Sequence, residues 1–218
     1  MTRVKICGVT NREDAQLACE LGADAIGLNF FPDSPRCVSP FLARTIGKGL
    51  PPYVAAVGVF VDWEPEVVVT LAKALGLTVA QLHGDESAED VAAIAEDLRV
   101  IKAVRPGRAV KVESLTAHKN VSAFLVDAAV SGEYGGTGVK ADWEFARAAV
   151  ATGKLRVILA GGLTPENVGE AIRSVRPYGV DVASGVESKP GKKDPGKLRT
   201  FFEEVVRANK DMAGSAGR

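Results

Sequence analysis

Two side chains that can exchange a proton stand at the ends of short apolar runs. Cys7 closes the run Val4–Cys7, and Asp127 directly follows the run Ala123–Val126. Alternate residues of a strand share a face, so Asp127 is expected to project from the same face as Leu125. Both groups are well placed for chemistry if the fold brings these strand ends together. Each also has a plainer interpretation, because free cysteines are often buried in cores and a strand-end carboxylate can cap a helix or pair with a cation.

Two glycine-containing segments near the C-terminus are suited to binding a phosphate. Gly161-Gly162 follows the apolar run Val157–Ala160, and Ser184-Gly185 follows the run Val180–Ala183. Glycines let backbone N–H groups approach an anion without a Cβ in the way. A glycine pair can also end a strand for structural reasons alone, but a second such segment in the matching position favours a phosphate site.

A guanidinium, a long loop and a polar strand face complete the candidate binding groups. Arg36 lies in a loop with two prolines, where a planar guanidinium can grip a carboxylate through two hydrogen bonds, although a solvated surface arginine is equally consistent. The glycine-rich loop Ser131–Gly138 is long for such a connection, and we predict that it closes over a ligand and that Gly138 adds an amide to the phosphate site. Gln81 and His83 share a strand face and could line a polar pocket, although a structural histidine is as consistent.

A repeating pattern of strands and helices must position these groups. Eight apolar runs of strand length recur, and amphipathic segments with helical spacing lie between most of them. Continuous apolar runs are typical of parallel strands covered on both faces, which are joined by right-handed crossovers. The pattern predicts a single-domain (β/α)8 TIM barrel over residues 1–210, with phosphate-binding loops after strands 7 and 8, and a frayed tail over residues 211–218. The runs are Val4–Cys7, Ala25–Phe30, Val54–Val61, Val79–Leu82, Val100–Val104, Ala123–Val126, Val157–Ala160 and Val180–Ala183.

The first turn separates this prediction from a doubly wound open sheet. Such sheets usually have five or six strands and a G-x-G-x-x-G first turn, whereas this chain has Gly8-Val9-Thr10 there. Thr10 and Glu13 have the spacing of a capping box and predict that a helix begins at this point. Because active sites of barrels lie at the carboxyl ends of the strands, the barrel predicts that the candidate residues meet at one end.

Composition limits the function classes. The 27 basic and 27 acidic side chains balance, which argues against a nucleic-acid-binding surface but permits a small basic pocket for an anionic metabolite. Three cysteines and two histidines without ligand spacing argue against a metal site. The chain shows no signal-peptide pattern and no run of about 18 apolar residues, so we expect no membrane association and a cytoplasmic location.

A set of short motifs is spread over about residues 3–206. The motifs are Lys5-Ile6-Cys7-Gly8, Gly27-Leu28-Asn29-Phe30, Ser34-Pro35-Arg36, Gln81-Leu82-His83-Gly84, Leu125-Val126-Asp127, Gly135-Gly136-Thr137-Gly138, Leu159-Ala160-Gly161-Gly162-Leu163 and Asp181-Val182-Ala183-Ser184-Gly185-Val186-Glu187. As a set, and in this order, they resemble the phosphoribosylanthranilate isomerase family.

The resemblance implies an aldose–ketose isomerase of tryptophan biosynthesis that carries out an Amadori rearrangement of N-(5-phosphoribosyl)anthranilate without a cofactor, as a monomer or homodimer. It assigns Cys7 as general base, Asp127 as general acid, Arg36 to the anthranilate carboxylate and the last two loops to the phosphate. Ala183 departs from the family, which often has serine there.

Other phosphate-binding barrels are the alternatives. The histidine-pathway isomerase performs the same rearrangement but has an aspartate where this chain has Cys7, and a pentose-phosphate epimerase would need metal ligands on several strand ends. A non-catalytic barrel that binds a phosphorylated metabolite is the alternative from another class. Within the preferred hypothesis, Lys5 lies two residues before Cys7 on the same strand face, and its ammonium would favour the thiolate.

Overall fold

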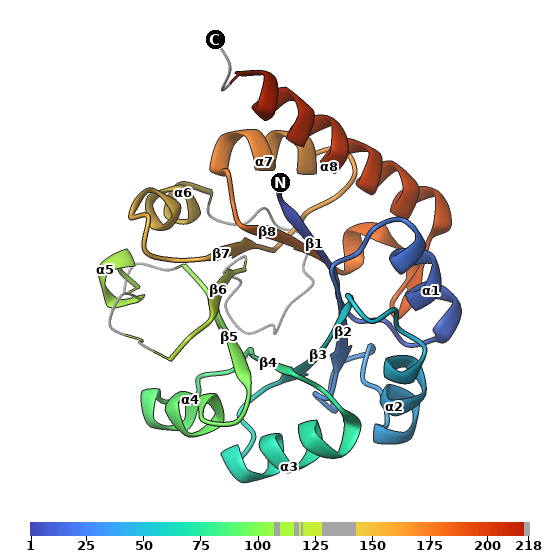
Figure 1. Ribbon diagram of the computed structural model, residues 1–218, viewed down its shortest axis with the longest axis vertical. Helices are drawn as coiled ribbons and strands as arrows, with labels where there is room; N and C mark the ends of the chain where they lie inside the picture. Colours follow the sequence, from blue (N-terminus) through green and yellow to red (C-terminus); the bar gives the residue numbers. More distant parts are fainter. Residues whose placement is uncertain (107–109, 116–117, 119, 128–142, 216–218) are drawn as a thin grey trace.

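Eight parallel strands close into a barrel, and helices surround it (Figure 1). The computed structural model describes residues 1–106, 110–115, 118, 120–127 and 143–215. The strands pair in the order of the sequence and β8 pairs with β1, so the predicted (β/α)8 barrel is confirmed. The barrel strands are β1 (Arg3–Ile6), β2 (Ala25–Asn29), β3 (Ala55–Phe60), β4 (Val79–Leu82), β5 (Arg99–Val104), β6 (Ala123–Val126), β7 (Val157–Leu159) and β8 (Gly179–Val182).

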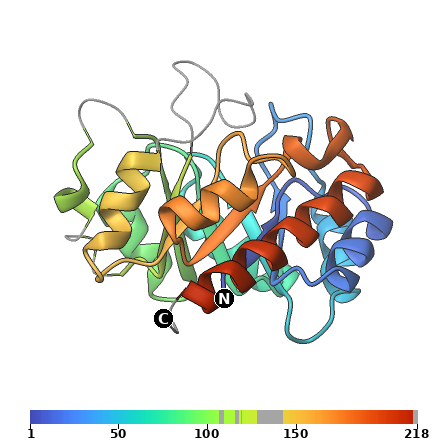
Figure 2. The ribbon, with the colours of Figure 1, turned by 90° about the horizontal axis from the view of Figure 1, so that it is seen from above.

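The helices follow the strands and form the outer ring that Figure 2 shows from the side. After β8 the chain first forms a short 3-10 helix, η1 (Ser184–Val186), and an antiparallel hairpin of β9 (Glu187–Lys189) and β10 (Lys192–Lys193). The pattern of apolar runs in the sequence does not predict this hairpin. The α-helices are α1 (Arg12–Glu20), α2 (Pro40–Lys48), α3 (Pro65–Leu75), α4 (Ala88–Ala95), α5 (Val112–Leu115), α6 (Trp143–Ala151), α7 (Val168–Val175) and α8 (Pro195–Ser215).

The alternation along each strand decides which side chains reach the barrel mouth. Leu125 and Val79 belong to a small apolar cluster inside the barrel, separate from the larger core between sheet and helices. The residue two positions after each of them lies on the same face of the strand, nearer its carboxyl end and beyond the packed interior. Asp127 and Gln81 therefore stand at the carboxyl end of the barrel, above its apolar filling.

The start of the first helix and the end of the last helix differ from the sequence-based prediction. The predicted capping box is wrong by one residue: Asn11 caps α1 by accepting from the backbone N–H of Asp14 at 2.8 Å, and the Thr10 hydroxyl instead donates to the Gly191 carbonyl of the hairpin. The last helix, α8, continues to Ser215, into the stretch expected to fray, because Asp211 pairs with Arg173 at 3.3 Å and the next residue packs on the core.

Candidate active site

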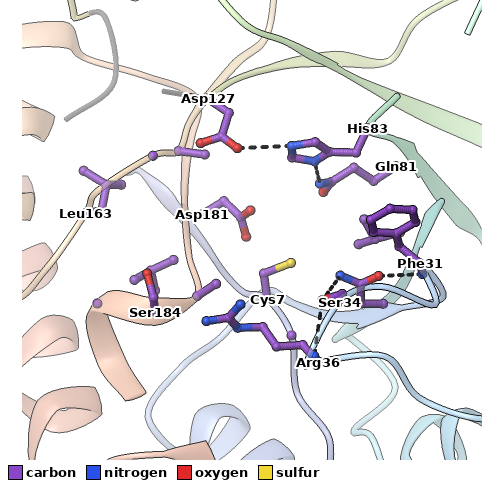
Figure 3. Close-up of a pocket in the computed structure, with 18 of the residues that line it drawn as sticks. Cys7, Phe31, Ser34, Arg36, Gln81, His83, Asp127, Leu163, Asp181 and Ser184 are labelled. Carbon is purple, nitrogen blue, oxygen red and sulfur yellow. Dashed lines mark hydrogen bonds and ion pairs between the residues drawn. The ribbon is translucent and has the colours of Figure 1, made fainter. Parts of the chain in front are cut away.

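A pocket opens at the carboxyl ends of the strands, and the predicted site residues meet there (Figure 3). Asp127 and His83 lie along one side of it, and Cys7 and Arg36 lie along the other. Gly138 and the loop Ser131–Gly138 lie outside the described residues. The candidates that line the pocket are Cys7, Arg36, Gln81, His83, Asp127, Gly161, Gly162, Ser184 and Gly185.

A chain of hydrogen bonds along one wall orients the Asp127 carboxylate. His83 Nε2 lies 3.1 Å from Asp127 Oδ2, and His83 Nδ1 lies 2.8 Å from the amide nitrogen of Gln81. Because the Gln81 amide nitrogen can only donate, Nδ1 accepts and Nε2 carries the proton that is donated to Asp127. The His83 imidazole thus fixes one oxygen of the Asp127 carboxyl group, and Asp127 is 6% exposed.

A buried lysine from β5 holds the segment that carries His83. Lys102 Nζ donates to the Gly84 carbonyl and to Glu86 Oε2, both at 2.8 Å. Burial opposes ionisation of Glu86, but the charge and hydrogen bond of Lys102 outweigh burial and lower the pKa of this carboxyl. Arg105 also donates to the His83 carbonyl at 2.6 Å. The end of β4 is therefore held by charged groups beneath it, which keeps the imidazole against Asp127.

Cys7 projects from β1 beside a buried ion pair. Lys5 Nζ lies 2.8 Å from Asp181 Oδ1, and these residues are direct neighbours in the pairing of β1 with β8. A Cβ at Gly27 of β2 would lie 2.9 Å from Cys7 Sγ and 3.0 Å from Lys5 Nζ, so both atoms occupy the space above that glycine. Thiol and ammonium are thus close neighbours, as the sequence-based hypothesis about Lys5 requires.

Burial and the neighbouring charges compete for control of the Cys7 thiol. Burial raises its pKa, Lys5 lowers it and Asp181 raises it, with a net rise. Burial disfavours the Lys5 ammonium as well, but Asp181 and Cys7 outweigh burial and raise the Lys5 pKa to about 12. Lys5 therefore stays charged, but the negative charge of Asp181 offsets much of the lowering that Lys5 exerts on the pKa of Cys7.

Opposite shifts are expected when the two charges beside Cys7 are removed separately. Lys5→Met should raise the pKa of the Cys7 thiol, because the cation that favours the thiolate is lost, whereas Asp181→Asn should lower it. The pKa is measured from the pH dependence of alkylation by iodoacetamide, in a background where Cys19 and Cys37 are alanine. Equal thiol pKa values in both variants would show that neither charge controls Cys7.

Arg36 reaches the pocket from the segment after β2 and is held from behind by Glu187. Its Nε donates to Glu187 Oε1 at 2.9 Å and its Nη2 donates to Oε2 at 2.7 Å. This hydrogen-bonded contact, opposed by burial, raises the pKa of the guanidinium. Gly8 has a φ of 68° and a Cβ there would collide with the Arg36 side chain, so glycine is required beneath the guanidinium.

The two glycine segments after β7 and β8 form the remaining wall. Gly161 and Gly162 both adopt left-handed backbone, with φ values of 79° and 64°. A Cβ at Gly185 would collide with the Leu163 carbonyl, so the two segments touch through their backbones. Asn167 donates to the Gly162 carbonyl at 2.8 Å and accepts from the Thr164 N–H at 2.9 Å, which fixes the first segment. Closely packed glycine backbone of this kind, lining a pocket, is suited to an anion such as phosphate.

The described residues contain no group of three His, Cys, Asp or Glu side chains that could hold a metal ion. No α-helix in the described ranges has the length and apolarity needed to cross a membrane.

Residues 4–204 match the family model described as N-(5'phosphoribosyl)anthranilate (PRA) isomerase. The chain belongs to this family. A PRA isomerase of Pelobacter propionicus is 48% identical over 202 residues, which are 93% of this chain and 94% of the relative. The structure of the isomerase from Thermus thermophilus superposes with a TM-score of 0.86 at 43% identity, covering 94% of this chain and 99% of that one.

Another similar structure is a PRA isomerase in complex with reduced 1-(o-carboxyphenylamino)-1-deoxyribulose 5-phosphate. It has a TM-score of 0.82 and 42% identity and covers 95% of this chain and 100% of that one. These comparisons confirm the family resemblance and identify the chain as an isomerase of tryptophan biosynthesis. The assignment of individual catalytic residues stays a proposal.

Several residues that shape the pocket of this PRA isomerase are not predicted as site residues by the sequence pattern. Asp181, Glu187, Lys193 and Lys102 are buried charged residues, and none was named as a site residue. A signal was available for two of them, because Asp181 and Lys102 interrupt otherwise apolar strands, and a charge in a strand covered on both faces needs a partner. Glu187 and Lys193 lie in the unpredicted hairpin and gave no such signal.

Proposed function

We propose that the pocket catalyses the Amadori rearrangement of N-(5-phosphoribosyl)anthranilate to 1-(2-carboxyphenylamino)-1-deoxy-D-ribulose 5-phosphate, with Asp127 as general acid and Cys7 as general base. The observation that carries this proposal is that one carboxylate and one thiol, 120 residues apart in the chain, face a single pocket. A rearrangement that needs protonation at one atom and deprotonation at another requires such a pair.

The substrate has two anionic ends, and the pocket has a group suited to each. The phosphate fits the backbone amides of Gly161-Gly162 and Ser184-Gly185. The anthranilate carboxylate fits the guanidinium edge of Arg36 that Glu187 does not use. Held at both ends, the ribose lies between Cys7 and Asp127, and this fixed placement removes much of the entropic cost of reaction.

Opening of the furanose ring is the first chemical step. Asp127, oriented by His83, gives a proton to the ring oxygen. The C1′–O bond breaks as the lone pair of the anthranilate nitrogen forms the C1′=N bond, which leaves an iminium cation. Asp127 becomes a carboxylate, and the His83 N–H stabilises that charge by donating to it.

Proton removal at C2′ is the second step. The iminium makes the C2′ proton acidic, and the Cys7 thiolate takes it, which leaves a Cys7 thiol and a neutral enolamine. The enolamine becomes the ketone when C1′ takes up a proton and the C2′ hydroxyl loses one. A cation beside a buried thiol favours the thiolate, so formation of the iminium offsets the burial that raises the pKa of free Cys7. Ring opening therefore favours the thiolate form of Cys7, which is the form that removes the C2′ proton.

Turnover of freshly prepared N-(5-phosphoribosyl)anthranilate tests the proposal, since the loss of substrate fluorescence reports the reaction. Turnover by the wild-type protein is expected. A chain that binds inorganic phosphate but does not consume the substrate would instead be a non-catalytic metabolite-binding barrel.

Replacement of Arg36 by methionine is expected to raise KM by about 10- to 100-fold with a smaller effect on kcat. Gripping of the carboxylate serves substrate and transition state alike, and hydrogen bonds to charged groups have this magnitude. Steady-state kinetics measure both constants, and Arg44→Met, which removes an exposed guanidinium from α2, is the matched control. A loss confined to kcat would contradict the role of Arg36 in binding.

A further inference from the structure

The hairpin β9–β10 places a fully buried lysine beneath the pocket. The Lys193 side chain is 0% exposed, and its Nζ donates to the Cys7 carbonyl at 2.6 Å, to the Ala183 carbonyl at 3.1 Å and to Glu187 Oε1 at 2.9 Å. An ammonium has three protons, and each of them has an acceptor here. Lys193 therefore connects the end of β1, the end of β8 and the hairpin at one point.

Glu187 is the link between this lysine and the pocket. Its side chain is 4% exposed and accepts two parallel hydrogen bonds from Arg36, one from Lys193 Nζ and a longer one of 3.4 Å from the Gly191 N–H. Burial opposes its ionisation, but Arg36 and Lys193 outweigh burial and lower the pKa of Glu187. One carboxylate thus lies between two basic side chains. Burial lowers the pKa of Lys193, and the charge and hydrogen bond of Glu187 oppose this effect.

We propose that Glu187 is the positioning residue of the substrate clamp: it holds the Nε–Nη2 edge of Arg36 so that the opposite edge faces the pocket, with Lys193 as its buried counter-charge. This inference rests on the proposed function of Arg36 as the group that binds the substrate carboxylate. It adds a residue that does not contact the substrate but determines how well Arg36 binds the substrate carboxylate.

The geometry of the guanidinium explains why such a partner matters. Arginine has a long side chain with many rotamers, and ordering it only when substrate binds would weaken binding. A two-point contact with Glu187 fixes both the position and the plane of the guanidinium in advance. Such a fixed plane suits a planar carboxylate and would not be reproduced by the single ammonium of a lysine.

A merely structural role for Glu187 is the competing explanation, because removing one partner of a buried ion pair is strongly destabilising. The variants must therefore separate stability from binding. Lys193→Met is the reference protein, since it keeps the Arg36–Glu187 contact, and Glu187→Gln is added to it so that no buried cation of the hairpin is left unpaired. Lys192→Met, the exposed neighbour in β10, is the control for the hairpin itself.

The test measures KM for N-(5-phosphoribosyl)anthranilate with these variants, each with Arg36 and with Arg36→Met. Adding Glu187→Gln to Lys193→Met is expected to raise KM about tenfold when Arg36 is present, the size expected from leaving one rotamer-rich side chain unordered. With Arg36→Met the same addition should change KM by less than about twofold, because the two residues act through one contact. Thermal unfolding of every variant is recorded alongside.

Three results would overturn the proposal in distinguishable ways. Equal KM values with and without Glu187→Gln, in an active enzyme, would show that Glu187 does not position Arg36 and would leave the proposed function intact. An equal rise in KM with Arg36 and with Arg36→Met would show that Glu187 acts elsewhere. A wild-type protein without turnover would overturn both this inference and the proposed function on which it rests.

Discussion

Replacement of Cys7 by alanine is expected to lower kcat by about 1000-fold and to change KM by less than about threefold. The thiol is the only group assigned to the C2′ proton, and removing it leaves water or buffer as the base. The phosphate segments and Arg36 do not depend on the Cys7 side chain, since Lys193 contacts its backbone carbonyl. Binding is therefore expected to survive the loss of catalysis.

Two measurements locate the defect at the second step. With substrate deuterated at C2′, Cys7→Ser should show a larger isotope effect on kcat than the wild type, because proton removal becomes rate-limiting. Cys19→Ala, which removes a thiol from the outer layer at α1, is the control and should retain full turnover. Near-normal turnover by Cys7→Ala would exclude Cys7 as the base.

The barrel and most of its mouth could be predicted because both depend on local spacing. Each apolar run marks a strand. Every second residue of a strand lies on the same face, so Asp127 at the rim of the pocket lies on the face of Leu125 in the barrel interior. The same spacing links Gln81 to His83. Once the chain is known to form a barrel, the strand ends must meet, so local patterns were sufficient to bring distant residues together.

The partners of these residues could not be predicted because they depend on contacts across the chain. Glu187 lies 151 positions after Arg36, and Lys193 lies 186 positions after Cys7. In a sequence, Lys192 and Lys193 are equivalent, yet one is exposed and the other is the most buried lysine of the hairpin. Only the folded hairpin distinguishes them.

The predicted helix cap illustrates the same limit on a smaller scale. Thr10 and Asn11 are both good N-cap residues, and the capping-box spacing favours Thr10. The structure uses Asn11, because the Thr10 hydroxyl is needed by the carbonyl of Gly191 in the hairpin. A tertiary contact 181 residues away thus decided between two equivalent local choices.

Replacement of Asp127 by asparagine is expected to lower kcat by about 1000-fold through loss of the first step. Asparagine has nearly the same shape, and its side-chain oxygen can still accept from His83 Nε2, which lies 3.1 Å from the native carboxylate. The variant therefore keeps the hydrogen bond between His83 and residue 127 but has no acidic proton for the ring oxygen. KM should change by less than about threefold, since neither anionic end of the substrate contacts this residue in the proposed complex.

The isotope effect distinguishes this variant from the Cys7 variants. When ring opening limits the rate, deuterium at C2′ should have almost no effect on kcat, so Asp127→Asn and Cys7→Ser should deviate from the wild type in opposite directions. Asp97→Asn, which removes an exposed carboxylate paired with Lys73, is the matched control. If Asp127→Asn instead showed a large isotope effect, proton removal at C2′ would depend on Asp127, and the roles of acid and base would have to be exchanged between the two sides of the pocket.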